Sequence, residues 1–162
     1  MFGVPRVFFV AADMTEREYP FRFAERCLYD YLENVARLEA LRTDLKVLDA
    51  ISSVKVQNYD GTPGSGYPSD SVSGRLQRIE RVEEDILHLE RRTLPIRRLY
   101  DDLRAGYVLE GSPKTTLRRI LELFYLGENT WQATAEELGL SRASFFRKKE
   151  ELVRLSIRYL GL

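Results

Sequence analysis

Basic and hydroxyl side chains gather in one short stretch near the end of the chain, SRASFFRKKE at 141–150. Arg, Lys and Ser are residue types that bind DNA phosphates, and arginine also reads base edges in the major groove. No acidic residue interrupts the stretch before Glu150, whereas a solvated helix more often mixes both signs. The residue types therefore predict contact with double-stranded DNA. The side chains that could make this contact are Arg142, Ser144, Arg147, Lys148 and Lys149.

Two short helices joined by a tight turn are expected to position these side chains. Thr130 can cap the first helix, and the small Ala135 allows a second helix to cross it closely. Gly139 supplies the left-handed conformation that ends a helix, and Ser141 can cap the next one. Phe145 lies midway along that second helix as its core residue. These features predict a helix-turn-helix whose second helix enters the major groove.

A preceding helix over 113–127 is expected to complete the core of this C-terminal unit, which spans 112–162. Ser112 or Thr115 can cap it, Pro113 suits its first turn, and Gly127 ends it. Its apolar stripe comprises Leu117, Ile120, Leu121, Phe124 and Tyr125. Its basic residues Lys114, Arg118 and Arg119 are candidates for holding phosphates.

The charge of the chain is balanced overall but unevenly distributed. The 162 residues carry no net charge and are 44% hydrophobic, which is enough to bury a core. Residues 113–162 hold nine Lys and Arg against six Asp and Glu, whereas residues 1–112 hold sixteen against nineteen. A C-terminal unit of net charge +3 on an acidic stem would contact phosphates with one end only.

Several classes of chemistry are not expected from this composition. Cys27 and His88 are the only residues of their types, so they allow no disulfide within the chain and no zinc site of ordinary composition, and no assembled Cys–His or Ser–His catalytic pair is recognisable. The glycines at 64 and 66 follow no apolar strand, so they do not form a phosphate-binding loop. We therefore expect no enzyme, no cofactor and no metal, and a reducing cytoplasm as the location.

The first nineteen residues are expected to form a tail. Their apolar stretch at 7–12 is too short to span a membrane and makes a poor secretory signal, and charged residues follow it from Glu16. No membrane contact is expected. A second hypothesis places the natural start at Met14, with residues 1–13 as a translated leader.

Two long helical stretches are expected over 20–106. In the first, from Pro20 to about Ile51, apolar residues recur at three- and four-residue steps; in the second, from about Ser71 to Leu103, Pro95 predicts a kink or a break. A Gly-, Pro- and Ser-rich connection at about 53–70 allows the chain to reverse. The prediction is an all-α fold, a long antiparallel hairpin resembling a coiled coil, followed by the helix-turn-helix unit. The expected seam comprises Ala24, Leu28, Tyr31, Val35, Leu38, Leu41, Leu45 and Leu48 on one side and Val72, Leu76, Ile79, Val82, Ile86, Leu89, Leu94, Ile96, Leu99 and Leu103 on the other.

The stretch LELFYLGENTWQATAEELGLSRASFFRKKEELVRLSIRYLG resembles the region-4 helix-turn-helix of sigma factors. It is more closely similar to small phage transcriptional regulators of the RinA and ArpU type, and the resemblance covers about residues 20–162. It implies an activator of late phage genes in a bacterial host cell, with RNA polymerase as a further partner. It also implies that Ser141 caps the recognition helix and touches a phosphate, that Arg142, Ala143, Ser144, Phe146 and Arg147 face the groove, and that Lys148 flanks them. Sigma factors have an apolar and then a basic residue where this chain has Phe145 and Phe146, so Phe146 either packs or meets a thymine methyl group.

The working hypothesis is a transcription regulator whose Arg142 or Arg147 reads guanine, while lysines 114, 148 and 149 hold phosphates. Three alternatives stay open: a DNA-packaging or architectural subunit, a protein-binding helical adaptor, and an RNA-binding antiterminator. The hairpin could pair with a second copy of the chain, with another protein or with polymerase, because a leucine seam serves all three. The operator sequence and the sign of regulation are not encoded in these patterns.

Overall fold

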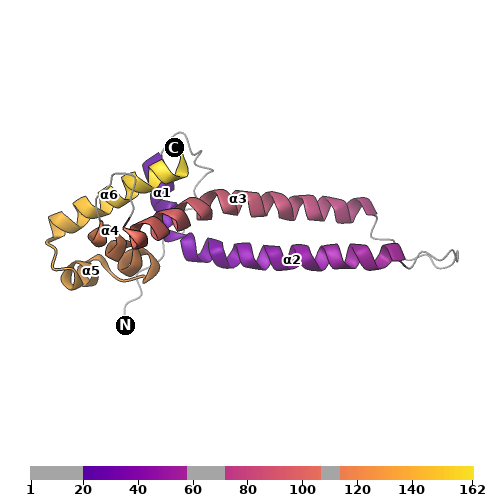
Figure 1. The fold of residues 1–162 in the computed structure, drawn as a ribbon, viewed down its shortest axis with the longest axis horizontal. Coiled ribbons are helices and arrows are strands. Elements are labelled where there is room, and N and C mark those ends of the chain that lie inside the picture. Colours follow the sequence, from indigo (N-terminus) through magenta and orange to yellow (C-terminus); the bar gives the residue numbers. More distant parts are fainter. Residues whose placement is uncertain (1–19, 58–71, 107–113) are drawn as a thin grey trace.

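The computed structural model describes residues 20–57, 72–106 and 114–162, and every regular element in these ranges is helical. The expected tail at 1–19, the connection beyond residue 57 and the segment at 107–113 lie outside the described residues. Helices α2 and α3 pack antiparallel as a long stalk, and the remaining elements form a head at one end of it (Figure 1). The all-α hairpin prediction is thus confirmed for the described part of the chain. The elements are α1 (Pro20–Tyr29), α2 (Tyr31–Gln57), α3 (Val72–Ala105), α4 (Thr115–Ile120), the π-helical turn η1 (Leu121–Leu126), α5 (Trp131–Glu137) and α6 (Arg142–Leu160).

The expected single helix from Pro20 to Ile51 is instead two helices that change direction at Asp30 (Figure 1). Backbone bonds continue across the change: the Asp30 N–H donates to the Arg26 carbonyl at 2.9 Å, and the Asn34 N–H donates to the Asp30 carbonyl at 2.8 Å. The reason lies in packing, because α1 buries its apolar face in the head while α2 runs along α3. At its other end α2 continues to Gln57, past the expected start of the connection, because the sequence has no glycine or proline between Pro20 and Gly61.

The sequence predicted a kink or a break at Pro95, and of these two the break does not occur, because helix α3 is continuous through Pro95. A proline removes only one intrahelical hydrogen bond, and the following residues Ile96 and Leu99 are buried in the head, which holds the helix together. The seam also differs by one position from the prediction. Thr93 is buried and donates its Oγ1 hydrogen to the Leu89 carbonyl at 2.9 Å, whereas Leu94 lies exposed.

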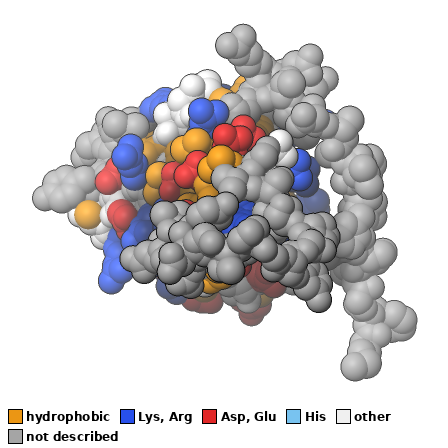
Figure 2. Space-filling view, turned by 90° about the vertical axis from the view of Figure 1, so that its right-hand side faces the viewer, with side chains coloured by type: hydrophobic (Ala, Val, Ile, Leu, Met, Phe, Trp, Pro, Cys, Tyr) orange, Lys and Arg blue, Asp and Glu red, His pale blue; other side chains and the backbone are white. Residues whose placement is uncertain are grey.

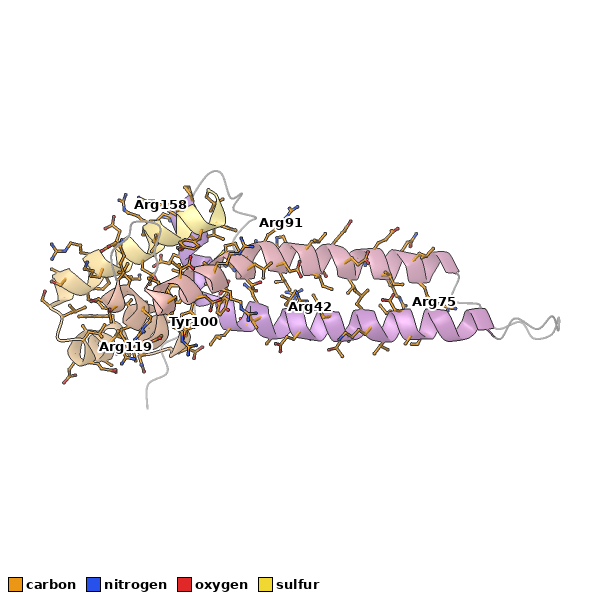
Figure 3. The ribbon with its side chains drawn as sticks, in the orientation of Figure 1. Arg42, Arg75, Arg91, Tyr100, Arg119 and Arg158 are labelled. Carbon is orange, nitrogen blue, oxygen red and sulfur yellow. The ribbon has the colours of Figure 1, made fainter. Side chains whose placement is uncertain are left out.

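The stalk has a small apolar core of its own. Leu38, Ile86 and Leu89 are buried between α2 and α3, and Arg42 reaches from α2 to Glu90 on α3 with an N···O distance of 2.6 Å (Figure 3). Toward the tip, the expected seam residue Leu76 is exposed. The stalk is therefore a thin two-helix rod. No helix in the described part of the chain is both long and apolar enough to cross a membrane.

The head has one continuous core built from both ends of the sequence. It joins α1, the last turns of α3, and all elements from α4 to α6. This core therefore includes residues from both the predicted hairpin at 20–106 and the predicted unit at 112–162. Phe145 is fully buried, as expected for a core residue. The buried members are Phe23, Ala24, Cys27, Leu28, Ile96, Leu99, Leu103, Leu117, Ile120, Leu121, Tyr125, Ala135, Phe145, Leu152, Val153 and Leu155.

The expected helix over 113–127 starts at Thr115 and changes to a π-helical turn at Leu121. Lys114 occupies the N-cap position, and no side chain caps this end, so Thr115 does not play the capping role proposed for it. Gly127 ends the helix as predicted, but by close approach and not by a left-handed conformation. A Cβ atom there would lie 2.7 Å from the Leu123 carbonyl oxygen, and the left-handed residue is the following Glu128, with φ of 52°.

Candidate nucleic-acid interface

The connection from α5 to α6 is fixed by caps at both ends. Thr130 accepts the Ala133 N–H at 3.2 Å and so caps α5. Gly139 adopts φ of +62°, and the Leu140 N–H donates to the Ala135 carbonyl at 2.8 Å, which closes the C-terminus of α5. Ser141 then caps α6 by accepting the Ser144 N–H at 3.3 Å. Each of these local predictions is confirmed, and the start of α6 is rigidly placed relative to α5.

Arg142 lies exposed over an aromatic platform at the start of α6. Its guanidinium carbon is 5.5 Å from the Trp131 ring centroid and 6.0 Å from that of Phe146. The two rings are 5.4 Å apart, and the Phe146 ring also contacts buried Phe145. Cation–π contact holds the arginine without neutralising its charge. Phe146 packs against Trp131 and Phe145 and is also 40% exposed, so the packing that the sequence proposed is present and contact with a thymine methyl group stays a prediction.

Arg147 lies five residues further along α6, on the side opposite buried Phe145. It is exposed, and its contact within the chain is a 3.5 Å bond from Nη2 to the Ser144 hydroxyl. Neither Arg147 nor Arg142 has an acidic partner within the described residues. Ala143 is exposed beside them and leaves room for close approach of a ligand surface. We call these residues, Arg142, Ala143, Phe146 and Arg147, the arginine face of α6.

Lys148 and Lys114 share one carboxylate. Lys148 Nζ is 2.8 Å from one oxygen of Glu151, and Lys114 Nζ is 3.1 Å from the other. Hydrogen bonds from Lys148 and then Lys114 hold the pKa of Glu151 below its usual range, although partial burial acts in the opposite direction. Lys148 borders the arginine face and is 42% exposed, so solvent weakens its ion pair. Lys114 is only 14% exposed and serves mainly to join α4 to α6.

Lys149 lies away from the arginine face. Its Nζ atom is 2.5 Å from a carboxylate oxygen of Glu25 on α1 and 5.6 Å from the centre of the Phe124 ring. The Lys149 and Glu25 side chains are only 19% and 23% exposed. Burial raises the pKa of nearby Tyr29, against the opposing effect of the Lys149 charge. Lys149 thus joins α6 to α1 and is not part of the arginine face.

The basic residues of α4 are also paired with acids. Arg119 binds Glu122 at 3.3 Å and Glu137 of α5 at 2.5 Å, which fixes α4 against α5. Arg118 lies 3.5 Å from Glu122. These contacts stabilise the head and leave the two arginines poorly placed to hold phosphates.

The sequence did not predict the roles of three residues near the arginine face: Trp131, Glu151 and Arg154. Trp131 orients Arg142, and Glu151 restrains Lys148. Arg154 continues the exposed side of α6 but pairs with Glu150 at 2.7 Å. The spacing in the sequence does indicate that Lys149 points toward the core, because a residue four positions after core Phe145 lies on the same face of the helix. No such spacing indicates the role of Trp131, because its partner Arg142 lies on another helix.

The arrangement concentrates unpaired positive charge at one place. The positive end of the α6 dipole adds to Arg142 in the first turn. By contrast, the surface seen end-on from the stalk tip mixes acidic, basic and apolar side chains on the described residues (Figure 2).

A comparison with protein-family models, curated proteins and solved structures found no match to this chain. The function is therefore inferred from the residues of this chain and their contacts.

Proposed function

We propose that this chain is a sequence-specific double-stranded DNA-binding transcription regulator, with α5 and α6 as a helix-turn-helix and α6 as its recognition helix. The observation that carries the proposal is the state of the basic residues on α6. Arg142 and Arg147 are exposed without an acidic partner, whereas Lys148, Lys149 and Arg154 are all paired. Arg142 and Arg147 lie five residues apart, about 1.4 turns along the first part of α6, and this part of a recognition helix contacts neighbouring base pairs in the major groove.

In this mechanism the first turns of α6 enter the major groove. Arg142 and Arg147 donate to guanine O6 and N7, and the exposed edge of Phe146 contacts a thymine methyl group. Ser141 lies at the helix N-terminus, where its hydroxyl and the backbone N–H groups meet a phosphate. Lys148 exchanges Glu151 for a phosphate on binding, which its exposed ion pair permits at little energetic cost.

The biological setting follows from the family resemblance of the C-terminal sequence. Residues 121–161 are similar to the region-4 unit of sigma factors and to phage regulators of the RinA and ArpU type. We infer an activator of late phage genes in the cytoplasm of a bacterial host, acting with RNA polymerase. Thr130, Gly139 and Ser141 support this assignment, because they make the caps and the turn that such a unit requires.

The test is selection of binding sites from a pool of random duplexes, followed by binding titrations of the enriched sequence. Trp131 is the only tryptophan and lies beneath Arg142, so its emission reports engagement of this face. We expect enrichment of one sequence, saturable change of Trp131 fluorescence, and affinity that falls steeply with salt. Failure to enrich any duplex sequence would refute the proposal.

Experiments with the same protein distinguish the proposed function from the three alternatives. A protein-binding adaptor shows no salt-dependent binding to duplex DNA. An antiterminator prefers single-stranded RNA to duplex DNA in direct competition, because an α-helix of this kind does not fit the deep, narrow major groove of A-form RNA. A packaging subunit assembles into rings that native mass spectrometry detects. Each of these outcomes contradicts the proposed function.

A further inference from the structure

Helix α2 carries a second apolar face in addition to the one that packs on α3. Leu32, Val47 and Ile51 are 50%, 53% and 46% exposed, although all three are large and apolar. Between them lie Ala36, Ala40 and Thr43, which are also exposed. These residues recur at steps of three and four, and buried Leu38 lies on the opposite side of the helix. We call the set Leu32, Ala36, Ala40, Thr43, Val47 and Ile51 the outer face of α2.

The outer face of α3 is different in character. Its exposed leucines, Leu76, Leu87 and Leu94, are separated along the helix by exposed charged residues, Glu80, Glu83 and Arg91. The charged residues interrupt the leucines, so α3 has no continuous second apolar stripe. Helix α2 has apolar stripes on two opposite sides, and only one of them has a partner within the described residues. A contiguous apolar stripe without a partner marks an interaction surface.

Charged residues border the outer face in an ordered way. Arg37 and Asp44 lie along one edge, and Glu39 and Lys46 lie along the other. All four are exposed, and none forms an ion pair within the described part of the chain. In a coiled coil, residues at these edge positions choose the partner and the orientation of the helices.

We propose that the outer face of α2 binds the same face of a second copy of this chain, with the two α2 helices antiparallel. With the two-fold axis between residues 41 and 42, Ala40 lies opposite the partner's Thr43, and Ala36 lies opposite the partner's Val47. Each of these two contacts occurs twice because of the two-fold symmetry. Small residues in three of these four positions allow the helix backbones to approach closely. The Thr43 hydroxyl donates to the Glu39 carbonyl at 3.0 Å, so its burial leaves no polar group unpaired.

The charges select this register and orientation. In the same antiparallel arrangement Arg37 lies beside the partner's Asp44, and Glu39 lies beside the partner's Lys46. Symmetry makes four pairs, and all of them join opposite charges. A parallel pairing in register places Glu39 beside the partner's Asp44, which brings like charges together twice. The edges of the outer face therefore favour the antiparallel dimer.

The dimer has a consequence for DNA, and this step alone rests on the proposed function. The heads join α2 at Asp30. At about 1.5 Å per residue, the two points of attachment are roughly 35 Å apart, on opposite sides of the two-fold axis. Two α6 helices related by a two-fold axis read an inverted repeat. A single chain of this size would bind its half-site weakly, and the dimer combines two such contacts.

Sedimentation equilibrium of the full chain without DNA tests the dimer independently of the proposed function. We expect a wild-type dimer at micromolar concentration and a monomer for Val47→Glu, in which a charge enters the centre of the interface. The matched control is Gln77→Glu on the outer face of α3, which should stay dimeric. Since Val47 is half exposed in the single chain, the substitution leaves the helix intact, as circular dichroism will check. A wild-type monomer, or a dimeric Val47→Glu variant, overturns the proposal.

A charge exchange tests the register. Arg37→Glu alone and Asp44→Arg alone each create two like-charge contacts, which should raise the dimer Kd about tenfold or more. The double variant R37E/D44R restores both attractions in the antiparallel register and should return the Kd to within about threefold of wild type. Loss of dimer in the double variant would overturn this register.

Disulfide formation tests the orientation. Residues 36 and 47 lie roughly 16 Å apart along one helix, too far for a bond within the chain. Across the antiparallel dimer they are adjacent, so the double variant A36C/V47C should form a covalent dimer under mild oxidation, and neither single variant should. The native Cys27 is buried and does not interfere. Cross-linking by the single variants would show a parallel dimer and refute the proposed orientation.

Discussion

Lys149→Met is the substitution that best distinguishes the structure from the sequence pattern. The pattern RKK places Lys149 with the DNA-binding residues, whereas the structure pairs it with Glu25 at 2.5 Å. Methionine has a similar aliphatic bulk but removes the charge, and with it both the ion pair with Glu25 and the cation–π contact with Phe124. We therefore expect a loss of folding stability without a change in the salt dependence of DNA binding.

The size of the effect follows from the exposure of the pair. Removing one partner of a fully buried ion pair costs about 3–5 kcal/mol, and exposed pairs contribute roughly 0.2–1 kcal/mol. With side chains 19% and 23% exposed, this pair lies between these limits, and we expect about 2 kcal/mol. The exposed pair of Arg154 with Glu150 offers a control, since Arg154→Met should cost under about 1 kcal/mol.

Urea unfolding of Lys149→Met, Glu25→Gln and the double variant completes the assay. The double variant should lose less than the sum of the single variants, by about 1–2 kcal/mol, because the two side chains contact each other. Each phosphate contact contributes roughly 0.9 to the slope of log K against log salt concentration. If Lys149→Met leaves stability unchanged and lowers that slope by about 0.9, Lys149 is a DNA contact and our placement of it is wrong.

Three further predictions concern the head. Lys148→Met should lower the salt slope of DNA binding by about 0.9, measured by anisotropy from 50 to 200 mM salt, because it removes one phosphate contact; an unchanged slope would show that Lys148 does not reach a phosphate. Because Lys148 and Lys114 lower the pKa of Glu151, its carboxylate stabilises the native state at neutral pH, and this contribution is lost as the pH falls through the lowered pKa; Glu151→Gln should therefore flatten the acid side of the stability profile. Gly127→Ala should destabilise the head by about 1–3 kcal/mol in thermal unfolding, because its Cβ meets the Leu123 carbonyl at 2.7 Å; an unaltered melting temperature would contradict the tight turn after η1.

The local features of the C-terminal helices could be predicted because each depends on a few neighbouring residues. A serine or threonine that caps a helix, such as Ser141 or Thr130, and a glycine that ends one, such as Gly139, act within one turn of the chain. The periodic seam of the stalk is also visible in the sequence, and it predicted the antiparallel hairpin. The caps of α5 and α6 and the antiparallel hairpin agreed with the structure, whereas Thr115 does not cap α4 and the seam contains Thr93 in place of Leu94.

Other features depend on partners distant in sequence and could not be read in the same way. No glycine or proline marks the change of direction at Asp30, which arises because α1 packs on α6 while α2 packs on α3. The ion pairs of Lys149 with Glu25 and of Lys114 with Glu151 join residues far apart in the chain. The basic run therefore includes residues whose charge is paired in the structure, and this pairing leaves Arg142 and Arg147, with Lys148 beside them, as the candidates for DNA contact.

The affinity of two single variants for the selected duplex, at one fixed salt concentration, tests the central claim most directly. Arg147→Ala removes an exposed arginine without an acidic partner, and Arg154→Ala removes an equally charged, exposed arginine on the same helix that is paired with Glu150. Loss of a bidentate contact to guanine is worth about 1–3 kcal/mol, so Arg147→Ala should weaken binding roughly 5- to 150-fold. Arg154→Ala should change it less than about threefold. Equal affinities for wild type and Arg147→Ala would contradict the assignment of the arginine face of α6 to DNA.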